Sequence, residues 1–222
     1  MAGWLSYSLS DFLMFSPDTY YRLFELHNAA VWPAQILAIL AAAAIAVLLW
    51  RRPPWQGRAV AAILAAAWLF VGWGFLLERY STIFPAASWL AWLFFAQGGL
   101  LAWSAVRRNA ERLSLSDDAS GRLAAMLLAV ALVLQPLAGP LAGRPWTGAE
   151  LFAVAPDPTA SATLAVLLLG AGRVRWLPLV LPLLWCLVSG LTLAAMDSPH
   201  ALLMPVFGVL AVCGALLRSR RA

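Results

Sequence analysis

Long apolar runs, broken only by short clusters of arginine, constrain this fold more than any other feature of the sequence. Hydrophobic residues make up 63% of the chain and charged residues only 11%. A soluble protein with so few polar side chains could not cover its surface against water. A membrane-spanning helix, by contrast, needs about 20 mostly apolar residues. The sequence therefore predicts an all-α, polytopic membrane helix bundle.

The apolar runs predict seven transmembrane helices, at about residues 30–50, 59–77, 83–106, 122–142, 158–172, 176–196 and 200–217. The fifth is the weakest, because Arg173 and Arg175 close it early. All 15 basic residues are arginine, and the loops on one side of the predicted membrane contain only Arg22, Arg79 and Arg144. Because the side richer in arginine is normally cytoplasmic, we expect the N-terminus outside and the C-terminus inside.

The stretch that begins at Ser16 predicts an amphipathic helix at the outer membrane interface. Ser16 and Pro17 suit a helix N-cap and first turn. At helical spacing, Asp18, Arg22 and Glu25 share one face, and the opposite face carries Tyr20, Leu23, Phe24 and His27. The chain thus divides into an outer amphipathic segment, residues 1–29, and a seven-helix transmembrane domain, residues 30–222. His27 is either a packed histidine or a ligand or proton acceptor at the mouth of the bundle.

The sequence APDPTA, residues 155–160, predicts an interrupted helix. Asp157 is suited to cap a helix that begins at Pro158. That helix would be only about 22 Å long, so residues 151–156 would dip below the outer surface as irregular backbone. Such backbone is tolerated only inside protein or along a watery cavity. We therefore expect Asp157 and Glu150 to line an outward-facing polar pocket with His27, although a capped helix without any ligand explains the same pattern.

Two glutamines, Gln97 and Gln135, fall near the middle of the third and fourth runs. They either form interhelical hydrogen bonds or line a solute path. No aspartate, glutamate or arginine is expected at mid-span, so the sequence does not predict a carboxylate proton relay of the usual kind.

Met196, His200 and Met204 form a weak candidate for a soft-metal site. They are spaced four residues apart around the sixth connection, and thioether and imidazole groups suit copper(I). Methionine is also common core filler, and Pro199 prevents a continuous helical face through the three. No cofactor is predicted.

Three motifs resemble an uncharacterised bacterial family of multi-pass membrane proteins that is known only as a domain of unknown function. They are LSDFLMFSPDTYYRLFELHNAAVWPAQ at residues 9–35, GRPW at 143–146 and APDPTA at 155–160. The resemblance implies a bacterial inner-membrane protein, and some members carry a permease label. Members with a histidine just before the Glu-Arg-Tyr triplet differ from this chain, in which Leu76 and Leu77 precede Glu78.

The sequence favours a small-solute permease or binding protein. The alternatives are a non-transporting accessory subunit that docks a membrane-protein partner, an outer-leaflet lipid-modifying enzyme, or a soft-metal handling protein. Enzyme activity is the less expected outcome. The bilayer is an expected partner, whereas nucleic acid is not, because the arginines cluster at the ends of apolar runs. A polar cavity that reaches Gln97 or Gln135 would favour the permease.

Overall fold

The described chain consists of α-helices, two π-helical segments (η2 and η4) and two short 3-10 helices (η3 and η5), joined by turns and loops. The computed structural model describes residues 15–107 and 112–220, and no β-strand forms within these ranges. Its elements are α1 (Pro17–Ala30), α2 (Ala34–Arg51), α3 (Gln56–Val71), η2 (Gly72–Leu77), η3 (Tyr80–Thr82), α4 (Ala87–Val106), α5 (Ala119–Ala129), η4 (Val130–Leu134), α6 (Gln135–Leu141), η5 (Trp146–Gly148), α7 (Pro156–Leu168), α8 (Leu177–Ala195) and α9 (Leu203–Ser219). The all-α prediction is confirmed, and the part of the opening motif before residue 15 lies outside the described ranges.

Helix α1 forms where the sequence predicts it. The Ser16 side chain accepts a hydrogen bond from the Thr19 backbone N–H, and Pro17 occupies the first helical position. The predicted apolar face, Tyr20, Leu23, Phe24 and His27, is buried, while Asp18 and Arg22 are exposed. The buried rings pack against Phe75 and Tyr80, so α1 closes one end of the bundle as part of its core.

Five helical stretches are long and apolar enough to cross a membrane. They are α2, residues Gln56–Thr82, α4, residues Ala119–Leu141 and α8. Helix α9 is apolar but shorter, and α7 has only 13 residues. Each of the seven predicted runs coincides with a helix, although the fifth ends at Leu168 and not at residue 172. Seven crossings and their orientation remain a prediction.

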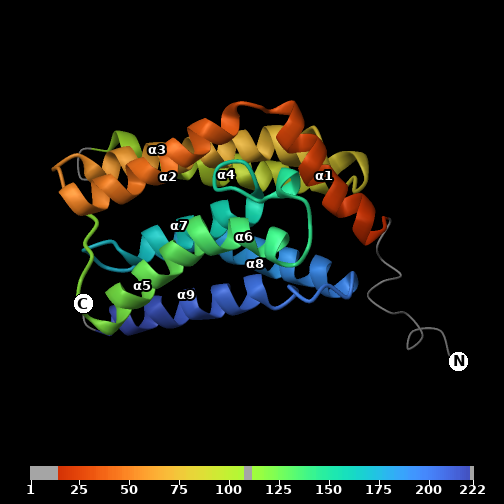
Figure 1. The fold of residues 1–222 in the computed structure, drawn as a ribbon. Helices are drawn as coiled ribbons and strands as arrows, with labels where there is room; N and C mark the ends of the chain where they lie inside the picture. The colour runs from red at the N-terminus through yellow and green to blue at the C-terminus, as the bar shows by residue number, and fades with distance from the viewer. Residues whose placement is uncertain (1–14, 108–111, 221–222) are drawn as a thin grey trace, which may run out of the picture.

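Helix α7 lies in the middle of the bundle. It packs against α3, α5, α8 and α9, and all its residues except Asp157 and Leu167 are buried. A helix of this length spans about 20 Å. Figure 1 shows that it occupies only part of the bundle's length, and that the segment between α6 and α7 lies toward the end closed by α1.

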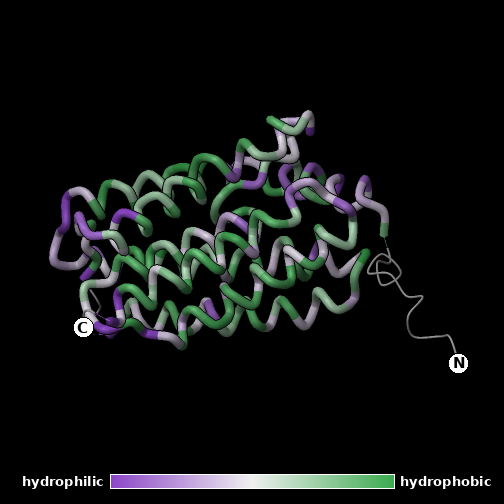
Figure 2. Tube along the Cα trace, turned by 90° about the horizontal axis from the view of Figure 1, so that it is seen from below, coloured by the Kyte–Doolittle hydropathy of each residue, from purple (hydrophilic) through white to green (hydrophobic). Residues whose placement is uncertain are grey.

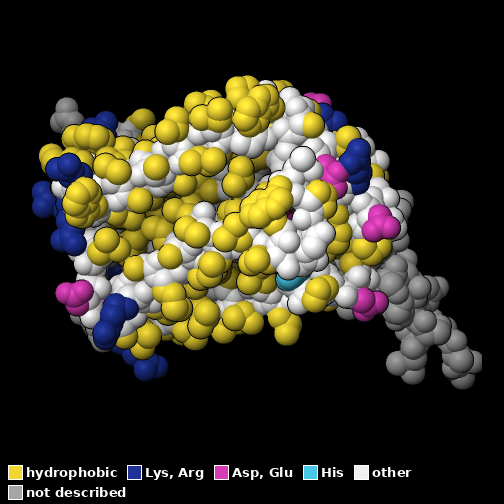
Figure 3. Space-filling model, viewed as in Figure 1, with side chains coloured by type: hydrophobic (Ala, Val, Ile, Leu, Met, Phe, Trp, Pro, Cys, Tyr) yellow, Lys and Arg dark blue, Asp and Glu magenta, His cyan; other side chains and the backbone are white. Residues whose placement is uncertain are grey.

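Polarity is concentrated at the two ends of the molecule. Figure 2 shows apolar residues along most of the helix length and hydrophilic residues mainly at the turns. In Figure 3, arginine gathers at the end that carries the C-terminus, whereas most of the visible acidic side chains lie toward the end that carries α1. The long sides of the bundle therefore present the apolar surface that a membrane would cover.

Candidate functional site

The segment between α6 and α7 enters the bundle as irregular backbone. Gly143 adopts a left-handed conformation with φ of +84° just after α6, which a residue with a side chain would rarely adopt. Farther on, the Thr159 hydroxyl accepts a hydrogen bond from the Ala153 N–H at 2.9 Å and donates one to the Ala155 carbonyl at 2.7 Å. Phe152 and Val154 are buried. Residues 151–155, all but the last residue of the predicted segment, are thus irregular backbone held inside protein, where such backbone is tolerated.

Asp157 connects this segment to the middle of α8. One carboxylate oxygen accepts a hydrogen bond from Trp185 Nε1 at 2.7 Å, and the other accepts one from Ser189 Oγ at 2.8 Å. Trp185 lies about 15 Å and Ser189 about 9 Å along the axis from the end of α8 at Ala195. The carboxylate therefore lies well inside the bundle, where the sequence predicted no acid.

The prediction that Asp157 caps this helix is wrong. The N-cap is Ala155, without a side-chain cap bond, and the helix begins at Pro156. Pro156 can take the first helical position as readily as Pro158, because neither needs a backbone N–H there. The earlier start places Asp157 in the first turn, where its side chain is free to reach α8.

Arg144 and Glu150 form an ion pair beside this carboxylate. Arg144 Nη1 lies 3.4 Å from Glu150 Oε1, and about a fifth of each side chain is exposed. The guanidinium also stacks over the ring of Tyr21, 4.2 Å from its centroid, in a cation–π arrangement. A Cβ atom at Gly139 would lie 2.9 Å from the guanidinium, so this glycine gives the arginine its space.

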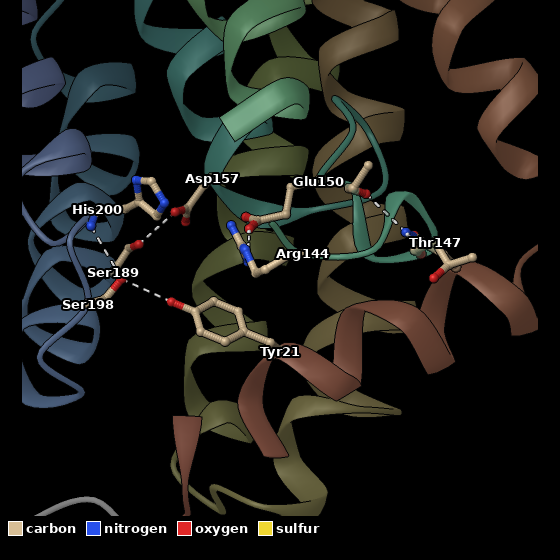
Figure 4. Close-up of polar contacts among 10 residues, drawn as sticks. Tyr21, Arg144, Thr147, Glu150, Asp157, Ser189, Ser198 and His200 are labelled. Carbon is tan, nitrogen blue, oxygen red and sulfur yellow. Dashed lines mark hydrogen bonds and ion pairs between the residues drawn. The ribbon is translucent and has the colours of Figure 1, made fainter. Parts of the chain in front are cut away.

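These groups surround a small cavity of about 30 Å³ at the N-terminal end of α7. Its wall includes Tyr21, Gln135, Arg144, Glu150, Asp157 and His200. Tyr21 also shares a hydrogen bond of 3.0 Å with Ser198, which joins α1 to the turn between α8 and α9 (Figure 4). A cavity of this size holds one or two water molecules. In this conformation it has no room for a larger solute.

Three polar atoms of the cavity wall lack a hydrogen-bond partner within the described residues. They are Gln135 Oε1, Arg144 Nε and His200 Nε2. Buried polar groups without partners cost free energy, so three of them on residues that line one cavity point to water or a ligand that completes the bonding. The mixture of donor and acceptor atoms suits a small polar guest.

The electrostatics of the site follow from two acids that share one arginine. Burial, and then the charge of Asp157, raise the pKa of Glu150 to about 7, while Arg144 opposes the shift. Burial, followed by the positive charge of Arg144, lowers the pKa of His200 below its ordinary value. Arg144 is consequently the only cation that faces the pair near neutral pH among the described residues.

The chain belongs to a protein family of unknown function (DUF6064), whose family model matches residues 17–222. This confirms the resemblance carried by the three sequence motifs. No curated protein and no solved structure matches the chain. The site must therefore be interpreted from its own geometry.

The two mid-span glutamines have different positions in this DUF6064 protein. Gln135 donates to Ser161 Oγ at 2.8 Å, contacts Met204 Sδ at 3.4 Å and lines the cavity. Gln97 lies elsewhere and donates to the Pro178 carbonyl at 3.0 Å. That carbonyl has no helical partner, because Pro182 lacks the N–H that would bond to it. Gln97 therefore stabilises a proline-containing helix.

His27 is packed against α3 and η2, away from the cavity wall. It is 1% exposed, meets the Phe75 ring edge-to-face at 5.4 Å, and lies next to Gly74. Burial, and then the charge of Arg79, lower its pKa to about 4, while the adjacent Val154 carbonyl opposes the shift. The ring is therefore neutral at physiological pH, and the structure does not bring it together with Glu150 and Asp157.

The candidate soft-metal residues are dispersed among other contacts. Met204 is fully buried and meets the side chains of Gln135 and Ser161, Met196 is buried, and His200 lines the cavity. Across residues 15–107 and 112–220, no group of three or more histidine, cysteine, aspartate or glutamate side chains could hold a metal ion.

Sequence reasoning missed Arg144, Trp185 and Tyr21 as members of the site. In the sequence, Arg144 stood out only as one of the three arginines on the arginine-poor side. One usable signal was present, because Trp185 and Ser189 are four residues apart and so present two donors on one helix face.

Proposed function

We propose that this protein is a small-solute permease or binding protein of the bacterial inner membrane, with seven crossings and the α1 end outside. The cavity beside the N-terminus of α7 is its outward-facing site. The observation that carries the proposal is the polar cavity that reaches Gln135 and holds three unpartnered polar atoms.

The position of the cavity supports this function. Interrupted helices whose ends lie inside a bundle form the substrate sites of many transporters. Here α7 begins inside the protein, and its first turn carries Asp157. The cavity is too small for most solutes, so a solute would enter only after α1 and the Tyr21–Ser198 contact move aside. The conformation described here corresponds to an occluded state.

A ligand screen on the purified protein in lipid nanodiscs tests the proposal. A solute at about 100 times its Kd should stabilise the folded state by about 2.7 kcal/mol, which raises Tm by roughly 5–10 °C. Asp157→Asn should remain folded and lose this shift. Asp18→Asn, an exposed acid on α1, should retain it. The proposal fails if no small polar solute stabilises the wild type, or if a well-folded Asp157→Asn protein is stabilised equally.

The orientation can be measured separately in whole cells. In a background without Cys186 and Cys213, Thr19→Cys at the start of α1 should react with a membrane-impermeant thiol reagent from outside. Ser219→Cys at the end of α9 should react only after the membrane is opened. Labelling of both positions from the same side would refute seven crossings with the α1 end outside.

An accessory subunit is the second candidate, and one observation favours it. A depression of about 530 Å³ at the outer end is lined by Trp32 and Trp146, whose exposed fractions are 67% and 69%. Exposed aromatic residues around a depression suit a protein partner. Under this alternative, the double variant Trp32→Ala and Trp146→Ala should lose a co-purifying protein that Asp157→Asn retains.

No observation favours the lipid-modifying enzyme. That hypothesis required an outer groove lined by His27 and acids, whereas His27 is 1% exposed and packed against Phe75.

A further inference from the structure

When both are ionised, the carboxylates of Glu150 and Asp157 carry more negative charge than the neighbouring groups neutralise. Both line the cavity at the outer end of α7, and Arg144 is the cation beside them. If both acids were ionised, this partly buried site would hold one uncompensated negative charge. Such a charge is costly in a low-dielectric interior. Two carboxylates that share a site normally resolve this cost by sharing one proton.

The hydrogen bonds indicate which acid is more readily ionised. Asp157 accepts charge-assisted bonds from Trp185 and Ser189, on both of its oxygens. Bonds of this kind favour the ionised form of a carboxylate. Within residues 15–107 and 112–220, the Glu150 carboxylate has only the longer 3.4 Å contact to Arg144. The geometry therefore leaves Glu150 as the acid that takes up the proton.

Gln135 provides an independent sign of a guest in this cavity. Its side chain is only 6% exposed, its Nε2 is bonded to Ser161, and its Oε1 has no partner although it belongs to the cavity wall. An amide oxygen in this position accepts a hydrogen bond from water or from a protonated carboxylic acid. The volume of about 30 Å³ admits a proton together with one or two waters.

The titratable and charged groups that face the pair come from every element packed around it. They are Tyr20 and Tyr21 of α1, Tyr80 of η3, Arg144 of the α6–α7 segment, Cys186 of α8 and His200 of the α8–α9 turn. Burial raises the pKa of Tyr20 well above its ordinary value and lowers the pKa of His200, so neither group adds charge to the pair near neutral pH. Their contribution leaves the charge balance of two acids against one arginine unchanged.

We propose that Glu150 and Asp157 form a proton-binding site that loads one proton from the outer side, and that this proton is the coupling ion of the protein. On loading, the Glu150 carboxylate becomes a carboxylic acid and Asp157 stays ionised opposite Arg144. In this conformation the proton exchanges with outside water through the cavity beneath Tyr21, and in the transport cycle it would leave on the inner side together with the solute. That the proton is a coupling ion rests on the proposed function, whereas the proton site itself rests only on the charge balance and the geometry.

Infrared difference spectroscopy across a pH titration tests the site in nanodiscs. A protonated carboxylic acid has a carbonyl band that an ionised carboxylate lacks. In the wild type this band should be present at acidic pH and disappear as the pH rises through about 7. Glu150→Gln should abolish it. Asp157→Asn removes the like charge and should move the midpoint at least about one pH unit lower.

Two further variants keep the test decisive if an amide variant folds poorly. Arg144→Gln removes the opposing positive charge and should move the midpoint higher. Asp18→Asn, on the exposed face of α1, should leave the titration unchanged. The absence of a titrating band in the wild type, or a band that persists in Glu150→Gln, would overturn the proposal.

Two controls distinguish a failure of the proton assignment from a failure of the permease proposal. If the midpoint falls when sodium chloride replaces choline chloride, the site takes sodium and the assignment to a proton is overturned. If the band titrates as expected but no solute stabilises the protein, the proton site stands and the permease fails.

Discussion

Helices α2 and α7 show opposite relations between hydrophobicity and burial. Only 22% of the apolar window of α2 is buried, and Leu37 and Leu40 are more than half exposed. Helix α7 is buried on almost every side, yet it is too short to count among the membrane-spanning helices. In a bilayer the apolar exterior faces lipid, so hydropathy identifies helices like α2. The interior helix is recognised by small and polar residues that pack closely or form hydrogen bonds.

The composition of α7 fits this interior position. Ala160, Ala162 and Ala165 are fully buried and allow neighbouring helices to approach. Thr163 accepts a hydrogen bond from Trp68 Nε1 of α3 at 2.8 Å. Asp157 bonds to α8. The difference places the proposed site of this bundle beside the helix with the weakest membrane signal.

The largest expected effect comes from the same substitution made in both helices. Leu164→Ala on α7, at a position with 0% exposure, should leave a cavity and lower the free energy of unfolding by about 3 kcal/mol. Leu40→Ala on α2, at 59% exposure, should change it by less than about 0.5 kcal/mol. Equilibrium unfolding of the two variants in mixed micelles measures both. Equal losses of stability in the two variants would show that burial does not distinguish α7 from α2.

A smaller effect is expected at Asp157. Asp157→Ala leaves Trp185 Nε1 and Ser189 Oγ without their acceptor, and should cost about 2 kcal/mol. Asp157→Asn retains an oxygen and a polar nitrogen, and should cost clearly less. The same unfolding assay applies. If alanine and asparagine behave alike, the contacts to α8 contribute little to stability.

A third effect is a pH dependence assigned to Glu150. Its pKa rises from 4.5 to about 7 on folding, so the folded state binds more protons between those values. The free energy of unfolding should therefore fall as the pH rises from about 4.5 to about 7. His27, with a pKa lowered from 6.5 to about 4, acts in the opposite direction between those two values.

Comparison with Glu150→Gln isolates this contribution, because His27 is present in both proteins. Unfolding curves measured at several pH values should show a steeper decline for the wild type than for the variant. Parallel pH profiles would show that Glu150 does not contribute to the pH dependence of stability.

The sequence was sufficient for the helices but not for the contacts of the site. Apolar runs and arginine clusters predict where helices lie, and Ser16, Pro17 and the amphipathic pattern predict α1 and its buried face. The short fifth run correctly indicated irregular backbone before α7. These features depend on local composition and period, which a sequence displays directly.

The position of Asp157 could not be predicted, because it depends on where α7 begins and on which helix lies beside it. Pro156 and Pro158 are equally good first residues, and the choice decides whether Asp157 caps the helix or points to α8. Arg144 reaches the site only because Gly139 leaves room for its guanidinium. Both features depend on tertiary contacts, and the residues that make these contacts follow no common helical period.

The contact between Asp157 and the middle of α8 is the central feature of the proposed site. The indole N–H resonance of Trp185 in a ¹⁵N-tryptophan spectrum, assigned by its loss in Trp185→Phe, reports this contact. We expect Asp157→Asn to shift that resonance and leave those of the exposed Trp89 and Trp103 in place, and Asp18→Asn to shift none of them. An unchanged Trp185 resonance in a folded Asp157→Asn protein would contradict the position of Asp157 inside the bundle, and with it the proposed site.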